Sequence, residues 1–495
     1  MRIKKILFLS DYKKFQAGDK VFFDTKRIIS LVGQNGSGKT TIMSILSNFF
    51  YNLERYDEKI KFDVEIQYSI ADSTGVFDIS IKHQNNLVEI SINGSEYNIV
   101  IPRTVSNQVS YKSLKEKFHL SSFEINDRFL DISDIKRYLP SNILGSVFSI
   151  HGEYPDDRNH NYIGELKHIS HNFPLERLFG HNHWSVGNIS LGILDIIQER
   201  KLFEKTFDLK WTRRIRIYDK QNEDISKDDS TEVGYWRKVN LTDAALMRKR
   251  IEEEKTTKFK DGLFINDIEF LKSDGRKITL NSMSAGEKFL FLRIMNLVNL
   301  SKENSLILIE EPELFLNPVW QRNYIDLLLS LFEQNCQVIF ATHSPYILEG
   351  AKSLEVESYI FHRDTNTLDR IDLFHTSLEG SINFISYQAF GILSNALHIE
   401  LFTILQIEAG GLKQLSKKLL QIKGMEKIIH TSTLKYGQVK VGDLVEEAIP
   451  VYIRNIIHHP EEEARSYGDT TLERSIKVLA SLVCDGDKII HLNKP

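Results

Sequence analysis

The pattern of apolar and polar residues at the start of the chain predicts a strand, a glycine-rich loop and a helix. Residues 3–32 have the pattern of strands around a turn and end in the apolar run IISLV at 28–32. Residues 41–50, TIMSILSNFF, then place apolar side chains at helical spacing. The stretch GQNGSGKT at 33–40 lies between the two. Strand, glycine loop and helix in this order are the context that a phosphate-binding loop requires.

In a second region, residues 61–102, apolar and polar residues alternate along the chain. Turn-forming residues at 72–75 and 93–94 interrupt the alternation. This period of two predicts an antiparallel meander of strands. The apolar positions are Phe62, Val64, Ile66, Tyr68, Ile70, Ile90, Ile92, Ile99 and Ile101.

A third region, residues 305–375, alternates between predicted strands and helices. We expect its strands to complete a parallel sheet with the strand at 28–32. Asn317 and Pro318 form a good helix start, because Asn caps a helix and Pro suits its first turn. The pattern predicts a strand at 306–309, a helix at 319–334 and strands at 337–341 and near 357–361.

The middle of the chain, residues 110–270, is mixed. It contains a helical stretch at 189–207 and a basic strand-like segment at 210–216. We find no sustained heptads, which excludes long coiled-coil arms. From about residue 380 the pattern is largely helical. We therefore predict an α/β head with a mixed sheet and an antiparallel β-subdomain over 1–378, and a mainly helical domain over 379–495. Within the head we expect lobes at 1–150 and 270–378 and an insertion at 151–269.

The bulk composition is that of an ordinary globular protein, with 495 residues, 41% hydrophobic and 26% charged. A net charge of −4 excludes a uniformly basic nucleic-acid coat. Cys336 and Cys484 lie far apart in apolar surroundings, which fits a reducing compartment rather than a disulfide framework or a zinc site. We find no apolar run long enough for a bilayer, and the N-terminus lacks a signal-peptide cleavage site. We expect a cytoplasmic protein without membrane contacts.

The glycine loop carries the first candidate chemistry. Its glycines let successive backbone N–H groups turn towards phosphates, and the following helix directs its positive end at the anion. Lys39 adds a fixed positive charge at the β and γ positions, and Thr40 offers a hydroxyl to Mg²⁺. The predicted ATP-binding residues in this stretch are Gly33, Asn35, Gly36, Ser37, Gly38, Lys39, Thr40 and Thr41.

Together with three downstream motifs, this loop resembles the head of ATP-binding-cassette (ABC) ATPases, in the branch that includes SMC, RecF and OLD-type proteins. The strand at 306–309 with Glu310 and Glu311 resembles the Walker B motif. The resemblance implies that Glu310, where the family usually has Asp, holds Mg²⁺ through water. Glu311 would be the general base that polarises the attacking water.

Two further motifs extend the resemblance. Ser284 and Gly286, in the sequence SAGE, match the ABC signature loop, whose helix we expect to begin near Lys288. His343 matches the switch histidine that senses the γ-phosphate. Residues 313–318 correspond to the D-loop at the dimer interface, and 146–149 is the best region for the Q-loop. In this family the signature loop of one subunit closes on the ATP of the other, so the resemblance implies a homodimer or higher oligomer.

The C-terminal part carries a second candidate motif, RNIIHH at 454–459. Arg454, Asn455 and His459 resemble the RX4H motif of HEPN ribonucleases, in which Arg and His act on an RNA phosphodiester. The alternative is that Arg454 and His458, one helical turn apart, share a surface without chemistry. Asp485 and Asp487 flank a glycine, which favours a tight turn over the metal site of an in-chain Toprim nuclease.

The stretch 381–390 and the later RNIIHHP resemble compact ABC ATPases of bacterial anti-phage systems. The Septu ATPase, including its retron-associated form, is the first resemblance and the PARIS ATPase the second. They imply an ATP-dependent sensor and scaffold that controls a separately encoded nuclease. The alternatives are a self-contained toxin with a HEPN-like RNase domain and a RecF-like DNA-repair ATPase. The basic segment 210–216 is a candidate nucleic-acid contact, although a charged strand edge is the favoured interpretation.

Overall fold

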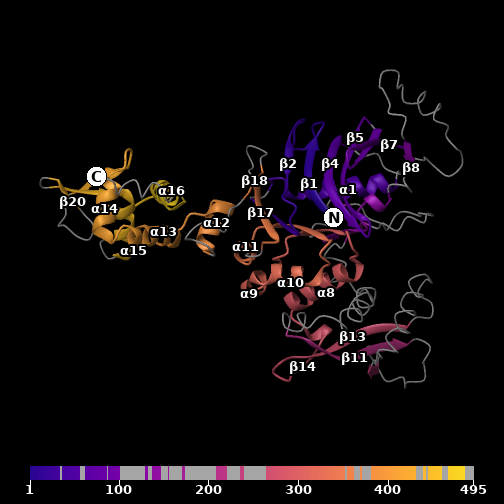
Figure 1. Cartoon of the computed structure of the whole chain (residues 1–495). Helices are drawn as coiled ribbons and strands as arrows, with labels where there is room; N and C mark the ends of the chain where they lie inside the picture. The colour runs from indigo at the N-terminus through magenta and orange to yellow at the C-terminus, as the bar shows by residue number, and fades with distance from the viewer. Residues whose placement is uncertain are drawn as a thin grey trace. The chain divides into compact units, whose positions relative to one another are not determined.

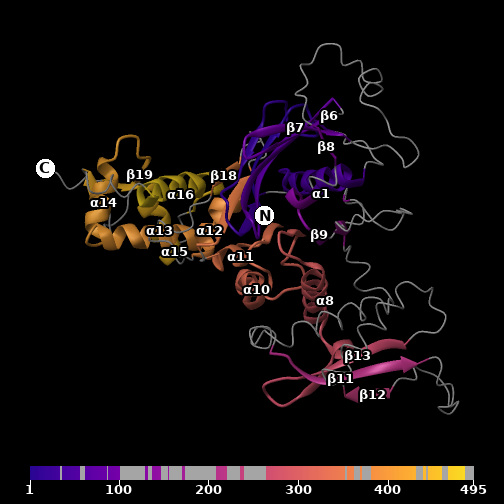
Figure 2. The same cartoon turned by 45° about the vertical axis from the view of Figure 1, so that its right-hand side comes forward.

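The structure is a computed structural model of the whole chain, which divides into two compact units, Met1–Arg370 and Ile371–Pro495. Figures 1 and 2 show the elements of each unit in two views. The described residues are 1–33, 36–55, 62–85, 87–100, 129–131, 136–146, 154, 170–172, 208–219, 235–238, 263–351, 354–361, 368–370, 381–430, 439–441, 444–459 and 466–484.

A parallel sheet forms the centre of the first unit, as predicted. Its strands are parallel throughout, except for the last, β18, which is antiparallel to β17. The strands β3, β15 and β16 are buried at every position, because their apolar runs are covered on both faces. In order across the sheet the strands are β10 (Ser170–Asn172), β9 (Ile143–Ser146), β15 (Leu306–Glu310), β16 (Gln337–Thr342), β3 (Ile28–Val32), β17 (Val356–Phe361) and β18 (Leu368–Arg370).

A second, mostly antiparallel sheet confirms the predicted meander. The strand β4 is buried at alternate residues, Val64, Ile66, Tyr68 and Ile70, so one face of the sheet faces the core. In order across the sheet the strands are β2 (Lys20–Phe22), β1 (Arg2–Phe8), β4 (Val64–Asp72), β5 (Gly75–Gln84), β6 (Leu87–Ile92), β7 (Ser95–Val100) and β8 (Phe129–Asp131).

The helix α1 (Lys39–Arg55) shares one hydrophobic core with both sheets. This core joins Ile6 of β1 and Ile66 of β4 to Ile45 of α1 and Leu308 of β15. Figure 1 shows α8 (Ala285–Leu300) and α10 (Tyr324–Leu331) on the other side of the parallel sheet from α1. The phosphate-loop candidate therefore leads into a helix that packs against both sheets.

The helix predicted at 319–334 is divided in the structure. It forms α9 (Pro318–Arg322) and α10 (Tyr324–Leu331), and Asn323 between them has φ −89° and ψ −1°. This conformation is typical of turns, and Asn adopts it readily because its side chain competes for backbone hydrogen bonds. The helix start was predicted correctly, since Asn317 caps α9 by accepting the Trp320 N–H at 3.0 Å.

A four-stranded antiparallel sheet leads into α8. The basic segment predicted as a strand forms part of β11, and the hairpin of β13 and β14 continues through a short 3-10 turn to α8. The helical stretch predicted at 189–207 lies outside the described residues. In order across the sheet the strands are β12 (Tyr235–Lys238), β11 (Lys210–Asp219), β13 (Leu263–Leu271) and β14 (Lys277–Thr279).

The second unit is mainly helical, as predicted, and has its own core. It also contains a small antiparallel sheet that the pattern did not indicate, because its strands are only three to five residues long. The helices are α12 (Ile382–Phe390), α13 (Asn395–Glu408), α14 (Leu412–Gln421), α15 (Ile449–His458) and α16 (Asp469–Cys484). The strands, in order, are β19 (Lys427–His430), β21 (Leu444–Ala448) and β20 (Val439–Val441).

Within the described residues, no single helix is both long and apolar enough to cross a bilayer. The helices α12 and α13 meet the length and composition test only as a pair, across a bend of 115°.

Candidate nucleotide-binding site

The glycine loop lies between β3 and α1, as predicted. Gly33, Gly36 and Gly38 have φ values of 141°, 76° and 111°, which only glycine adopts without strain. At Gly33 a Cβ would also lie 2.7 Å from the Phe361 carbonyl oxygen. The loop is therefore a tight turn that depends on its glycines. Asn35, also a predicted contact, lies outside the described residues.

Lys39 is the buried cation of the loop. Its side chain is largely enclosed, and its Nζ donates to the Gly33 carbonyl oxygen at 2.7 Å. Burial lowers the pKa of Lys39 to about 8, although the nearby Glu311 and Glu313 carboxylates act to raise it. Helix α1 has no acidic residue in its first turn, so its positive end has no competing carboxylate of its own. This arrangement suits a bound anion.

Glu310 and Glu311 follow each other at the end of β15. The buried Glu310 carboxylate accepts a hydrogen bond from the Tyr154 hydroxyl at 2.9 Å and is also hydrogen-bonded to the Thr40 side chain. Burial raises the pKa of Glu310. Glu311 has φ 43°, an uncommon value for a residue with a side chain, and its N–H donates to the Ala341 carbonyl oxygen at 2.9 Å.

His343 follows β16 and is tied to the D-loop candidate. Its backbone N–H donates to Glu313 Oε1 at 2.6 Å, and the Thr342 hydroxyl donates to Glu313 Oε2 at 2.9 Å. Burial, with a further contribution from the charge of Lys39, lowers the pKa of His343 to about 4. The imidazole is therefore neutral at pH 7, when it can donate one hydrogen bond and accept another.

One cavity of about 270 Å³ brings most of these predicted residues together. It is bounded by the glycine loop, by both Walker B acids and by His343, and also by two lysines that sequence reasoning missed. The lining residues are Lys13, Lys14, Gly36, Ser37, Gly38, Lys39, Thr40, Thr41, Glu310, Glu311, Ala341 and His343.

Lys13 and Lys14 follow the first strand, where no known motif pointed to them. Lys14 crosses the glycine loop, since a Cβ on Gly38 would lie 2.2 Å from its Cε. Its ammonium also lies 5.4 Å from the ring centre of Phe15 and 5.3 Å from that of Phe361. A basic pair between aromatic residues, YKKF at 12–15, is the only signal that the sequence offered.

The oxygen atoms of Thr40 and Glu310 fit a hard divalent cation. They lie in the same cavity and are hydrogen-bonded to each other. Among the described residues, no group of three or more His, Cys, Asp or Glu side chains is arranged to hold a metal on its own. This donor set is typical of Mg²⁺, which proteins usually bind with one or two oxygen ligands plus substrate phosphates and water.

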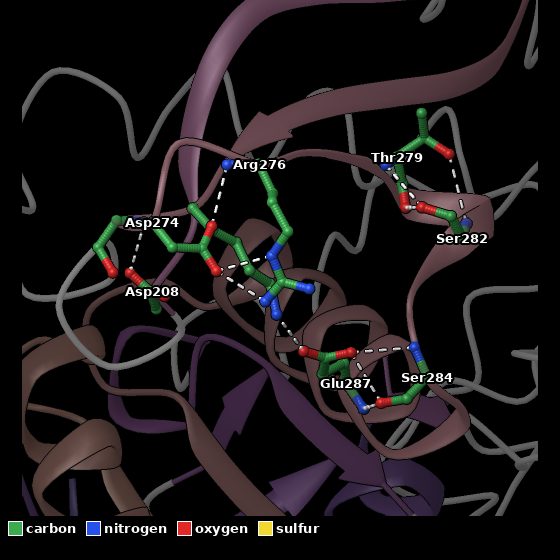
Figure 3. Close-up of polar contacts among 9 residues, drawn as sticks. Asp208, Asp274, Arg276, Thr279, Ser282, Ser284 and Glu287 are labelled. Atoms are coloured by element: carbon green, nitrogen blue, oxygen red, sulfur yellow. Dashed lines mark hydrogen bonds and ion pairs between the residues drawn. The ribbon is translucent and has the colours of Figure 1, made fainter.

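Ser284 caps helix α8, which begins at Ala285 and not near Lys288 as expected. The earlier start follows from a capping box, in which the Glu287 N–H bonds to Ser284 Oγ while Glu287 Oε2 accepts from the Ser284 N–H at 3.0 Å. The Ser284 hydroxyl also donates to Glu287 Oε2 at 2.8 Å, and Lys272 holds the other Glu287 oxygen at 2.9 Å. Figure 3 shows this network beside the similar box of Thr279 and Ser282.

The signature and D-loop candidates contact each other directly. A Cβ on Gly286 would lie 2.2 Å from the carbonyl oxygen of Phe315, a residue with φ 62°, so the close approach requires glycine here. Phe315 and Val319 are exposed to 56% and 59%. Ser284 and Gly286 are not among the residues that line the cavity with Lys39. The structure thus does not bring them to the phosphate loop of their own chain.

The C-terminal motif lies at the end of α15. Asn455 is buried, and its amide donates to Glu447 Oε1 at 2.5 Å, while Arg454 donates to Asn455 Oδ1 at 3.0 Å. His459 is exposed and ends the helix as its C-cap. Asn455 is therefore turned towards the core of its unit. The 485–487 turn and residues 147–149 of the Q-loop candidate lie outside the described residues, whereas Ser146 ends β9.

Comparisons with known proteins found similar chains and one matching family. The chain is 24% identical over 395 residues to the "Retron Vc95 probable ATPase" of Vibrio cholerae serotype O1 biovar El Tor, covering 70% of this chain and 72% of that protein. The SMC head domain from Thermotoga maritima covers 75% of this chain and all of that one, with 14% identity and a TM-score of 0.33. An SMC head bound to the C-winged helix domain of ScpA covers 75% and 98%, with 11% identity and a TM-score of 0.37.

Residues 28–349 match the family described as "AAA domain, putative AbiEii toxin, Type IV TA system". This range runs from the strand before the glycine loop to α11 (Pro345–Glu349), just after His343. The chain belongs to this family and is a nucleotide-binding P-loop ATPase.

Proposed function

We propose that this ATPase of the AAA-domain family is a switch that closes as a homodimer around ATP and controls a separate effector. The observation that carries the ATPase part is a single cavity bounded by Lys39, Thr40, Glu310, Glu311 and His343. A buried cation, a pair of carboxylates and a neutral imidazole around one space suit the transfer of a phosphoryl group to water.

Each side chain has a distinct role in this proposal. Lys39 releases the Gly33 carbonyl and binds the β- and γ-phosphates, while Thr40 and Glu310 hold Mg²⁺. The metal neutralises charge on the phosphates. Glu311 accepts a proton from the attacking water, and its backbone hydrogen bond to Ala341 fixes its position. His343 donates a hydrogen bond to the γ-phosphate.

The proposal of a homodimer rests on what the cavity lacks. Ser284 and Gly286 match a phosphate-contacting loop but do not line the cavity of their own chain. Beside them, Phe315 and Val319 expose apolar side chains on the D-loop and α9. A second copy that lays its signature loop on the nucleotide would bury both and complete the site.

Two solution measurements test this part. Phosphate release should require both ATP and Mg²⁺, and light scattering should show a monomer without nucleotide and a dimer with ATP. The variant Phe315→Asp should bind ATP as well as wild type but remain monomeric, because it places a charge in the proposed interface. Leu354→Asp is the matched control, since Leu354 is 90% exposed and belongs to neither motif. A dimer that forms equally well in Phe315→Asp would contradict the interface.

We further propose a role in anti-phage defence, in the manner of Septu or retron-associated ATPases, with a separately encoded nuclease as effector. The support is the similarity to a retron ATPase over more than two thirds of both chains. The test is to tag the chain in its native gene neighbourhood, purify it with ATP and Mg²⁺ and identify co-purifying proteins by mass spectrometry. A nuclease that leaves the complex when Glu311→Gln replaces wild type would indicate control by ATP turnover. If no nuclease co-purifies, the proposed role is contradicted.

A second candidate is a toxin whose C-terminal unit cuts RNA. Two observations favour it: the family that matches residues 28–349 is described by the name of a toxin, and the exposed His459 caps the C-terminal end of α15, the helix that also carries the half-buried Arg454. His459→Ala should then abolish toxicity while phosphate release stays unchanged. His458→Ala is the control, because His458 is equally exposed but out of the motif spacing. Toxicity that depends on Glu311 but not on His459 would contradict the RNase.

A further inference from the structure

Arg293 of α8 is a fully buried arginine outside every motif described above. Only 2% of it is exposed, and its guanidinium lies 4.8 Å from the ring centre of Phe289. Removing a charged group from water is strongly unfavourable unless its hydrogen bonds are satisfied. No sequence pattern marks Arg293, because a single Arg in a helix has the same signature whether it is exposed or buried.

The guanidinium of Arg293 joins three separate elements. Its Nε donates to Ser146 Oγ at 2.7 Å, at the end of β9. Its Nη2 donates to the Glu310 carbonyl oxygen at 2.7 Å and its Nη1 to the Glu311 carbonyl oxygen at 3.2 Å, at the end of β15. The planar fork of Arg allows these bonds in fixed directions, which the single ammonium of Lys does not.

These bonds act on the backbone of the two acids. Arg293 bonds to their carbonyl oxygens, while the Glu310 carboxylate is directed at Thr40 and Tyr154. Glu311 has φ 43°, a left-handed conformation that is unfavourable in a residue with a Cβ. Its N–H is fixed by Ala341 and its carbonyl by Arg293, so both sides of this strained residue are fixed.

We propose that Arg293 is a positioning residue for ATP hydrolysis. It fixes the backbone of Glu311 against the helix that begins with the signature loop, and so sets where the Glu311 carboxylate meets the attacking water. Arg293 is not among the residues that line the nucleotide cavity. This inference rests on the proposed function, in which Glu311 is the general base.

The first test compares Arg293→Lys with wild type. We expect kcat to fall about tenfold to a hundredfold, since a misplacement of about 1 Å of a catalytic group has an effect of this size. The KM and the Kd for the non-hydrolysable analogue AMP-PNP should stay within about twofold, because the phosphate loop is untouched. Ser146→Ala, which removes one acceptor without a charge, should lower kcat in the same direction but less. Arg276→Lys is the matched control and should leave kcat unchanged, because Arg276 is exposed and pairs only with Asp274 among the contacts shown in Figure 3.

A second test separates positioning of the base from an effect on the signature loop. In a mixed dimer with one Lys39→Ala subunit, a single site remains, which uses Glu311 of one chain and Ser284 of the other. Arg293→Lys should slow turnover at least tenfold more when it is in the chain that supplies Glu311 than when it is in the chain that supplies Ser284. The reverse order, an unchanged kcat in Arg293→Lys, or a parallel loss of AMP-PNP affinity would overturn the inference. A wild-type protein without phosphate release would instead overturn the proposed function itself.

Discussion

Two helices of the ATPase unit follow a loop of small residues, but the groups around their N-terminal ends differ. Helix α1 follows the glycine loop, has no acidic residue in its first turn and opens into the cavity. Helix α8 has Glu287 in its first turn, and this carboxylate takes hydrogen bonds from both the N–H and the hydroxyl of Ser284. The first helix is ready to receive an anion, whereas the second already holds an anionic group from its own chain.

This difference gives the two loops different tasks in the proposed dimer. The phosphate loop binds ATP in a single chain, because its donors and Lys39 already surround the cavity. The signature loop must first give up the Glu287 carboxylate if the Ser284 hydroxyl is to bond to a phosphate. A capping interaction of this kind contributes about 1 kcal/mol, so a γ-phosphate presented by a partner subunit is strong enough to displace it.

The largest expected effect on ATP binding is at the N-terminal end of α1. Lys39→Ala should weaken ATP binding roughly 100-fold, because a charge-assisted contact to phosphate in a partly buried site is lost. Isothermal titration with ATP measures this, and thermal unfolding checks that the variant is folded. Lys39→Arg is the control, since it keeps the charge but not the fit to the Gly33 carbonyl. Retained affinity in Lys39→Ala would contradict the phosphate-loop assignment.

The next effect concerns chemistry after binding. Glu311→Gln should lower kcat by about 10²- to 10⁴-fold, because the amide cannot accept a proton from water. The Kd for ATP should be unchanged, and the ATP-bound dimer should accumulate and be visible by light scattering. Glu313→Gln is a useful comparison, since Glu313 bonds to Thr342 and His343 and does not line the cavity. Normal turnover in Glu311→Gln would show that another group is the base.

The glycine loop before α1 and much of the fold were predictable from local patterns. The apolar strand 28–32, the glycines and the helical spacing after Lys39 lie within a short stretch, and the structure places β3 and α1 there. The meander followed from its period of two for the same reason. Each of these signals needs only residues that are close in the sequence, so no knowledge of tertiary contacts was required.

The contacts that join distant segments were not predictable. Arg293 meets Ser146 across 147 positions, and Tyr154 meets Glu310 across 156. Lys13 and Lys14 reach the cavity only because the turn after β1 lies against the glycine loop. No residue pattern marks such partners, since an Arg in a helix or a single Tyr has the same sequence signature whether exposed or buried. The roles assigned to the site residues stay predictions.

A smaller effect on kcat than that of Glu311→Gln is expected at the N-terminal end of α8. Ser284→Ala should lower kcat about 100-fold, because one donor to the transferring phosphoryl group is removed. It should leave the ATP affinity of the monomer unchanged, since Ser284 does not line the cavity of its own chain. Thr279→Ala is the matched control, because Thr279 is the N-cap residue of the same kind of capping box just before it in the chain. If both variants lose activity equally, helix capping rather than phosphate contact explains the effect.

The smallest effect is on stability, and it tests whether the capping carboxylate is held in its ionised form. Lys272→Met should lower the free energy of unfolding by about 1 kcal/mol at pH 7, because the ion pair to Glu287 is only about 20% exposed. Burial alone would raise the pKa of Glu287, but the hydrogen bonds from Lys272 and Ser284 outweigh it and lower that pKa below 4.5.

The sign of the pH dependence follows from that lowered pKa. A carboxyl whose pKa is lower in the folded state stabilises the protein above its unfolded pKa, and the contribution is lost as the pH falls through the folded value. Urea unfolding should therefore separate wild type from Lys272→Met at pH 7, and the difference should shrink below about pH 4.5. Lys277→Met is the control, because it removes a more exposed ion pair. The Lys277 side chain is 60% exposed, and its Nζ lies 3.8 Å from Glu269 Oε1. If the difference in unfolding free energy stays the same at acid pH, Lys272 stabilises α8 by packing. The ionised Glu287 carboxylate would then not be what caps the N-terminal end of α8.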